Sequence, residues 1–301
     1  MTSLRWAALV LTTTCAVLMS AALVSGCASL TESSAASTPA PVVPASTVRV
    51  AYGTEPDQFG DLYLPATSAR AIPVVVMIHG GGWHQKRDLT YFAPLAQSLV
   101  DRGVAVWNIE YRRTGGAGGW PMTLADANDA VEALAGTVQG AAGGRLDLAR
   151  VHLAGHSAGG QLAAYVASRH NLPTSAPGAQ PNIRAVSLTT MAGVFDLSRA
   201  YSAGDRFLPA FLGAPADVPD RYAVASPILH LPLGLRVNAL HGALDLTVPA
   251  DQSTRFVDAA RIAGDPASVQ ILPFAGHGDF GNAMSPAWFV AHQTILESVF
   301  G

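Results

Sequence analysis

Residues 151–160 read Val-His-Leu-Ala-Gly-His-Ser-Ala-Gly-Gly, and this stretch decides the fold. A short strand-like run leads directly into a G-x-S-x-G pattern, and a helical pattern begins after it. Glycine at positions 155 and 159 permits a turn too tight for larger residues, so we expect Ser157 to protrude at the head of a helix. The helix dipole stabilises negative charge developing there. The stretch predicts a serine placed for nucleophilic attack; an ordinary glycine–serine turn is the alternative.

Working outward from this stretch, residues 48–52 and 59–64 are interpreted as an opening pair of strands. Short apolar runs predict the other strands of the sheet, at 74–78, 104–109, 151–154, 185–190, 237–240 and 269–272. Such near-continuous runs are typical of strands covered on both faces, as in a parallel sheet. Helical patterns separate them, at 89–100, 123–138, 161–167, 253–262 and 286–300. The alternation predicts an α/β fold, a three-layer sandwich with a mostly parallel sheet. Residues 195–232 interrupt the rhythm and are interpreted as a small cap or lid.

A second motif, His-Gly-Gly-Gly-Trp at residues 79–83, follows one of the predicted strands. Sites in such folds lie at the carboxyl ends of the strands. Consecutive glycines let backbone N–H groups approach a ligand, as an acyl-transfer enzyme requires to hold an oxyanion. We expect Gly81 and Gly82 to donate these hydrogen bonds together with Ala158. A phosphate cradle is the alternative, but no Gly-Lys-Ser/Thr follows. His79 is interpreted as a structural hydrogen-bonding residue that braces the loop.

Together these motifs resemble the α/β-hydrolase superfamily, and within it the esterases and lipases that carry an HGGG motif. Two further stretches fit the superfamily's order of Ser, then Asp or Glu, then His. Residues 241–249, HGALDLTVP, are similar to its H-G-x-x-D-x-x-V-P, and residues 273–280, PFAGHGDF, to its G-x-x-H-x-F ending. The resemblance implies Ser157 as the nucleophile, His277 as the base and Asp245 as the acid that orients the histidine.

These roles suit the chemistry of the side chains. Histidine, with a pKa near about 6.5, removes a serine proton near neutral pH, and the aspartate fixes its tautomer and stabilises the imidazolium. Asp196, which follows another predicted strand, is the rival acid. His152 and His156 are interpreted as packing residues.

Two aromatic residues are candidate walls of the substrate pocket. Trp83 ends the HGGGW motif, and Trp120 ends a glycine-rich loop. Simple packing is the alternative for both. Residues 110–113, Glu-Tyr-Arg-Arg, are similar to the family's Y-R element and are interpreted as a structural ion pair.

The N-terminal segment has the pattern of an export signal. Arg5 precedes an apolar stretch that ends in Leu-Val-Ser-Gly-Cys, residues 23–27. This ending resembles the lipobox of bacterial lipoproteins, in which the peptide is cut before the cysteine and the thiol carries diacylglycerol. We expect residues 1–26 to be a signal peptide and residues 27–47, rich in Ser, Thr and Pro, to be a tether that starts at a lipidated Cys27. A plain signal peptide or an uncleaved anchor helix is the alternative.

Composition excludes other classes of protein. Half of the 301 residues are apolar, the net charge is −3 and no basic run occurs, so nucleic-acid binding is not predicted. Cys15 and Cys27 are the two cysteines, and both precede the predicted catalytic domain, residues 48–301. A disulfide framework and a thiolate metal site in that domain are therefore excluded. No H-E-x-x-H motif or cluster of carboxylates occurs, so neither a metal nor a cofactor is predicted.

These features predict a serine hydrolase that cleaves small-molecule carboxylic esters through an acyl-enzyme. The resemblance implies short- to medium-chain acyl or aryl esters. Arylformamidases, which act on N-formylkynurenine, and acetyl-xylan or feruloyl esterases are alternatives that use the same machinery. A non-catalytic envelope-binding protein on a hydrolase fold is the alternative from another class. We expect the protein to be exported and anchored to a membrane of the cell envelope through Cys27, or secreted if Cys27 carries no lipid.

The lipid anchor can be tested by mass spectrometry of the exported protein. We expect diacylglycerol on Cys27 because the thiol stands where the lipobox requires it. Cys15→Ser serves as a control and is expected to leave the lipid in place, since Cys15 leaves with the signal peptide. An unmodified Cys27 in the exported protein contradicts the prediction.

Overall fold

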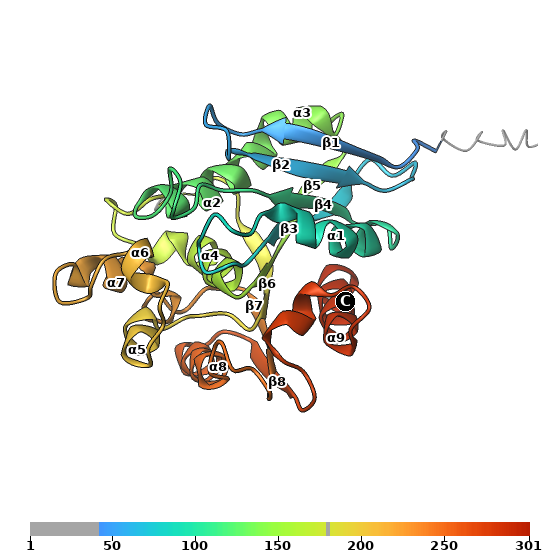
Figure 1. Cartoon of the computed structure of the whole chain (residues 1–301). Coiled ribbons are helices and arrows are strands. Elements are labelled where there is room, and N and C mark those ends of the chain that lie inside the picture. Colours follow the sequence, from blue (N-terminus) through green and yellow to red (C-terminus); the bar gives the residue numbers. More distant parts are fainter. Residues whose placement is uncertain (1–41, 179–180) are drawn as a thin grey trace, which may run out of the picture. The chain divides into compact units, whose positions relative to one another are not determined.

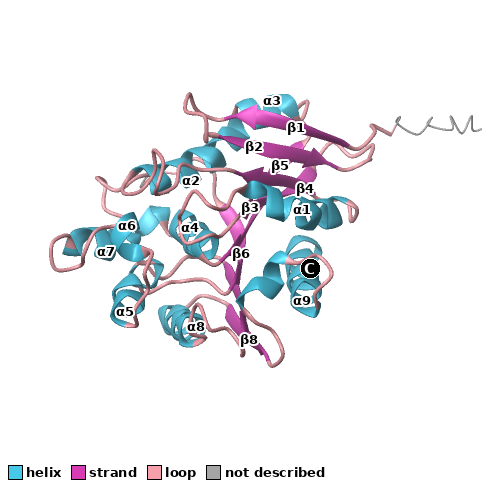
Figure 2. Ribbon diagram, in the orientation of Figure 1, coloured by secondary structure: helices cyan, strands magenta, loops and turns pink. Residues whose placement is uncertain are grey.

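An eight-stranded sheet forms the centre of the structure, a computed structural model that describes residues 42–178 and 181–301 (Figures 1 and 2). The strands are β1 (Ser46–Ala51), β2 (Phe59–Leu64), β3 (Ile72–Ile78), β4 (Ala105–Ile109), β5 (Leu146–His156), β6 (Ala185–Met191), β7 (Arg236–Gly242) and β8 (Ala267–Leu272). Their order in the sheet is β1-β2-β4-β3-β5-β6-β7-β8. β1 and β2 run antiparallel to their neighbours, whereas β4, β3 and β5 to β8 are mutually parallel. The mostly parallel sheet expected from the sequence is confirmed. The predicted signal peptide and Cys27 lie outside the described residues.

Helices cover both faces of this sheet. The longer ones are α1 (Ala93–Val100), α2 (Met122–Glu132), α4 (Ala158–Ala167), α8 (Asp251–Ala263) and α9 (Pro286–Phe300), and a short α3 (Thr137–Ala141) follows α2. Three short helices, α5 (Leu197–Ser202), α6 (Leu208–Phe211) and α7 (Pro219–Ala225), connect β6 to β7. Single 3₁₀ turns lie at Leu89–Phe92, Ala133–Ala135, Arg169–Asn171, Pro227–Leu229 and His277–Gly281. Within the described ranges, none of the helices has the length and apolar character needed to cross a bilayer.

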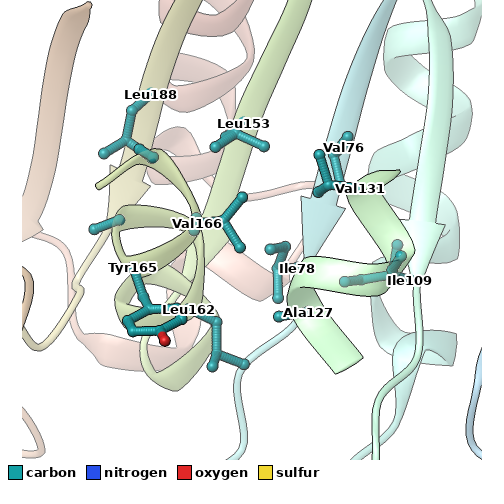
Figure 3. Packing of buried hydrophobic residues seen from close by; sticks show 14 of the residues in the cluster. Val76, Ile78, Ile109, Ala127, Val131, Leu153, Leu162, Tyr165, Val166 and Leu188 are labelled. Carbon is teal, nitrogen blue, oxygen red and sulfur yellow. The ribbon is translucent and has the colours of Figure 1, made fainter. Parts of the chain in front are cut away.

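The hydrophobic core is split into two layers because successive residues of a strand face opposite sides. In β3, Val74, Val76 and Ile78 belong to the cluster that includes α2, α4 and Phe256 of α8. Figure 3 shows part of this layer, where Val76 and Ile78 lie near side chains of α2 and α4. Alternate residues of β3 belong to the other cluster, with α1 and α9. All seven residues of β3 are buried, as expected of a strand covered on both faces.

Two predicted elements differ most from their expected bounds. β5 starts at Leu146 rather than at 151, because its first residues pair with the start of β3 across a shift of register between Pro73 and Val74. The helix predicted over 123–138 is broken into α2, a 3₁₀ turn and α3. Gly136 adopts a non-helical conformation with φ −126° and ψ −103°, which ends the first helical segment.

A close backbone approach sets the junction between β5 and α4. A Cβ atom at Gly159 would lie 2.1 Å from the carbonyl oxygen of Ile78 and 2.4 Å from that of His79. A Cβ atom at Gly155 would lie 2.2 Å from the carbonyl oxygen of Gly159. Backbone atoms of a central strand cannot move aside as a flexible side chain can. Glycine at these positions therefore allows α4 to begin directly against the end of β3.

We predict that Gly159→Ala lowers the free energy of unfolding by about 2 kcal/mol or more, because the added methyl group overlaps backbone atoms of β3. Gly140→Ala is the matched control. Gly140 lies in α3 with no atom within 4 Å of an added Cβ, so alanine there is expected to be neutral or to stabilise by about 0.5 kcal/mol. Urea unfolding measures both, and equal stabilities for the two variants would show that the contact is unimportant.

Candidate active site

Ser157 stands at the turn between β5 and α4. Its backbone has φ +55° and ψ −122°, a conformation that residues with a side chain rarely adopt. The backbone N–H of Ser157 donates to the carbonyl of Met191, at the end of β6, over 2.8 Å. The side chain is thereby held out of the sheet, as the G-x-S-x-G pattern predicts.

Three chain segments bring a serine, a histidine and an aspartate together. His277 Nε2 lies 2.9 Å from Ser157 Oγ, and His277 Nδ1 lies 2.7 Å from Asp245 Oδ2. Asp245 follows β7, and His277 follows β8. The carboxyl ends of parallel strands meet at one edge of the sheet, so residues 120 positions apart meet there. The arrangement matches that of a serine nucleophile, its base and the acid that orients the base.

The carboxylate of Asp245 is buried and fully engaged. Its Oδ1 accepts hydrogen bonds from the backbone N–H groups of Thr247 and Val248, each over 2.8 Å. Its Oδ2 faces His277 and also lies 3.3 Å from His241 Nε2. Burial raises the pKa of Asp245, but the hydrogen bonds from His241, His277 and Val248 outweigh it and hold the pKa well below its ordinary value. The group is therefore anionic and suited to stabilise an imidazolium.

The rival acid has another task. Asp196 accepts a hydrogen bond from the backbone N–H of Arg199 over 2.9 Å and caps the start of α5. It makes no contact with His277. The structure therefore brings Asp245, and not Asp196, to the histidine.

The glycine loop after β3 places backbone N–H groups beside Ser157. Gly81 and Gly82 have φ of +123° and +63°, which favours glycine. Both line one cavity with Ser157 and Ala158. The N–H of Gly80 is engaged by Tyr91 Oη at 2.6 Å. Within the part of the chain that the structure describes, the N–H groups of Gly81, Gly82 and Ala158 have no acceptor. These are the three groups that the sequence predicts to hold an oxyanion.

A buried carboxylate anchors this loop from behind. Glu110 Oε1 lies 2.9 Å from His79 Nε2 and 3.2 Å from Arg113 Nε, and Glu110 Oε2 accepts from the N–H of Leu89 over 3.0 Å. Tyr111 donates its hydroxyl to the carbonyl of His79 over 2.7 Å. The interpretation of His79 and of the Glu110 segment as structural agrees with these contacts.

The two tryptophans predicted as pocket walls differ in position. Trp83 lines the cavity but is only 1% exposed. Its indole N–H donates to Gln161 Oε1 in α4 over 2.9 Å, and its ring stacks on Phe211 with centroids 4.7 Å apart. Trp83 therefore ties the glycine loop to α4 and to the cap. Trp120 is not among the residues that line the cavity; it packs against the hydrophobic core instead.

The cavity above Ser157 has a volume of about 750 Å³. Asp205, Arg206 and Phe207 line it from the segment between β6 and β7, where the sequence predicts a cap. A Cβ atom at Gly82 would lie 2.6 Å from the ring of Phe207, so this segment touches the glycine loop. Among the described residues, no group of three or more His, Cys, Asp or Glu is placed to hold a metal ion.

His156 links the glycine loop to the catalytic histidine, a role that sequence reasoning missed. Its Nε2 donates to the carbonyl of His277 over 2.9 Å, and its Nδ1 lies 3.3 Å from the hydroxyl of Tyr91, which in turn accepts from Gly80. A carbonyl can only accept, so the proton sits on Nε2 and Nδ1 accepts from Tyr91. Burial, reinforced by the charge of His277, lowers the pKa of His156 to about 3. His156 is therefore neutral near neutral pH.

His241 was also missed as a contributor. The sequence placed His241 four residues before Asp245, in the H-G-x-x-D pattern. That spacing alone does not predict a contact, because residues four apart in a strand and the turn after it need not face each other. The contacts of Tyr91 had no signal in the sequence.

The fold and this site define an α/β-hydrolase with a serine nucleophile. The chain belongs to the BD-FAE family of α/β-hydrolase esterases, whose model matches residues 60–259. It is 30% identical over 240 residues to the esterase LipQ of Mycobacterium tuberculosis, covering 76% of this chain and 54% of that protein. The chain thus spans about half the length of the curated relatives it matches.

Two solved structures are similar as well. The propionate-bound esterase Est2 of Thermogutta terrifontis has a TM-score of 0.66 at 25% identity, over 83% of this chain and 92% of that one. A bifunctional GH43-CE protein of Bacteroides eggerthii has a TM-score of 0.69 at 25% identity, over 83% of this chain and 37% of that one.

Acid is expected to destabilise the fold through His156. The unfolded chain takes up this proton near pH 6.5, whereas the folded protein resists it down to about pH 3. Between these values the unfolded state binds more protons, so stability falls as the pH falls, by up to about 1.4 kcal/mol per pH unit. His156→Gln keeps an N–H donor but cannot titrate. Its unfolding free energy, measured in urea from pH 4.5 to 7.5, should decline less steeply; a slope equal to that of the wild type would refute this role.

Proposed function

We propose that this protein is a serine hydrolase that cleaves carboxylic esters through an acyl-enzyme. The observation that carries the proposal is the chain of contacts from Asp245 through His277 to Ser157 Oγ, at 2.7 Å and 2.9 Å. Three backbone N–H groups free to bind an oxyanion lie in the same cavity. Membership of an esterase family and the similarity to LipQ support the same reaction.

The reaction proceeds in two halves. Ser157 Oγ attacks the ester carbonyl as His277 Nε2 takes its proton, and the resulting oxyanion accepts hydrogen bonds from Gly81, Gly82 and Ala158. His277 then gives the proton to the departing alcohol, which leaves an acyl group on Ser157. A water molecule, deprotonated by His277, attacks this acyl group. The bond between the acyl carbon and Ser157 Oγ then breaks, His277 returns the proton to Oγ, and the carboxylic acid leaves. Asp245 stabilises the imidazolium in both halves.

Short- to medium-chain acyl or aryl esters are the proposed substrates. The propionate bound to the similar esterase Est2 supports a small acyl group. An acetyl-xylan or feruloyl type of esterase is the second candidate, and the similarity to the GH43-CE protein supports it. An arylformamidase would use the same groups on a different bond. Competition between N-formylkynurenine, an acetylated xylo-oligosaccharide and an aryl ester in one kinetic assay separates the three.

We also propose that the protein is exported and held at a membrane by a lipid on Cys27. The support is the sequence of residues 1–27 alone. In that arrangement, the folded part works on esters outside the cytoplasm.

Ser157→Ala is expected to lower kcat for 4-nitrophenyl acetate and butyrate by about 10⁴–10⁶-fold, because no other group replaces the nucleophile. Ser68→Ala, in an exposed loop, is the control and should match the wild type. A fluorophosphonate probe should label the wild type and Ser68→Ala but not Ser157→Ala. Equal rates for Ser157→Ala and the wild type would exclude the mechanism, and failure of the probe to label Ser157 would favour a binding protein without catalysis.

A further inference from the structure

The catalytic cavity has a charge opposite to that of the whole chain. Three cationic side chains line it, Lys86, Arg87 and Arg206, against a single lining acid, Asp205. The fixed charge of the lining is thus +2, whereas the chain as a whole carries −3. Charged residues make up only 13% of the sequence, so three cations around one cavity need a physical explanation.

These cations have no carboxylate partner within the described residues. The salt bridges of the described chain include no side chain of Lys86, Arg87 or Arg206. Instead, the Arg87 guanidinium lies 5.8 Å from the ring centre of Tyr91, and that of Arg206 lies 5.0 Å from the ring centre of Phe207. All three are exposed, so their charges act on whatever enters the cavity.

The nearby acidic groups are committed elsewhere. Asp205 Oδ1 accepts hydrogen bonds from the backbone N–H groups of Phe207 and Leu208, over 2.8 Å and 3.2 Å. Asp245 is buried, and its oxygens are taken up by His277, His241 and the backbone. Among the described residues, neither acid forms an ion pair with one of the three cations.

The cations flank the loop that holds the reacting carbonyl. A Cβ atom at Gly81 would lie 2.6 Å from Cβ of Arg87, so the stem of Arg87 lies directly beside this glycine. The ring of Phe207 lies against Gly82, and Arg206 is its neighbour in the chain. An ester bound at Ser157 therefore enters a cavity whose lining next to the oxyanion loop includes two arginines.

We propose that the preferred substrates are esters that carry a second, anionic group such as a carboxylate, in either the acyl or the alcohol part. The inference rests on the proposed function and adds the substrate's charge. A cavity lined by one sign of charge concentrates ligands of the opposite sign and speeds their association. An ion pair between one exposed cation and the substrate's anionic group is weak. The three cations together are expected to favour an anionic ester about tenfold in kcat/KM over a neutral ester of the same shape.

Two matched pairs of esters test this with the purified protein. Monomethyl adipate against methyl hexanoate places the charge in the acyl part; 4-acetoxybenzoate against methyl 4-acetoxybenzoate places it in the alcohol part. Each rate is divided by the rate of alkaline hydrolysis of the same ester, which removes differences in intrinsic reactivity. We expect the anionic member to lead in at least one pair, and to lose its lead between about 0.02 M and 0.5 M salt because exposed charges are screened.

The variant Lys86→Gln/Arg87→Gln/Arg206→Gln should remove most of this preference. The control for total charge is Arg70→Gln/Arg102→Gln/Arg236→Gln, which removes three exposed arginines outside the cavity and should keep the preference. Equal corrected rates within both pairs overturn the inference, as does a preference that survives either high salt or the triple variant. The salt series needs only the wild type, so misfolding of the variant cannot obscure the result.

The same assays distinguish a failure of the proposed function from a failure of the inference on substrate charge. If the wild type hydrolyses none of the four esters faster than Ser157→Ala, the catalytic mechanism is wrong. If it hydrolyses the neutral esters as fast as the anionic ones, the mechanism stands and only the inference on substrate charge is lost.

Discussion

The site depends on how closely three pieces of backbone approach one another at the end of β3. Gly159 lies against the carbonyls of Ile78 and His79, and a Cβ atom at Gly80 would lie 2.7 Å from the carbonyl of His156 and 2.9 Å from Cβ of Ser157. Side chains larger than hydrogen would force these segments apart. The nucleophile and the loop beside it are therefore positioned by steric fit of main chain, which leaves little freedom for either to shift.

Buried polar contacts then complete what this fit begins. Behind the glycine loop, the Glu110 carboxylate contacts His79 and Arg113 and accepts a hydrogen bond from the backbone N–H of Leu89. The Asp245 carboxylate likewise accepts hydrogen bonds from two backbone N–H groups. An unpaired carboxylate in either place would be costly, because a buried charge needs partners. Neutral His156 joins the two regions. The protein thus buries the two carboxylates that support the site without leaving either of them unpaired.

Much of this could be predicted from the sequence, and the reason is physical. Strands covered on both faces require unbroken apolar runs, so the central strands could be located, and the glycine motifs indicated where the backbone must turn tightly. The break at Gly136 and the early start of β5 depend on packing with distant segments, which a local pattern does not record. The roles of His241 and Tyr91 depend on contacts between separate elements, and the packing of Trp120 depends on the core as a whole. Apart from the place of His241 four residues before Asp245, none of these has a signature within its own stretch of sequence.

The segment between β6 and β7 contributes no strand to the sheet, yet Asp205, Arg206 and Phe207 line the cavity. The reacting groups thus come from strand ends, whereas part of the lining that meets the substrate comes from a connection outside the sheet. Within this connection Phe211 is constrained because it stacks on Trp83, but Arg206 is exposed. Substitution at such an exposed position can therefore change which esters enter the cavity while Ser157, Asp245 and His277 keep their places.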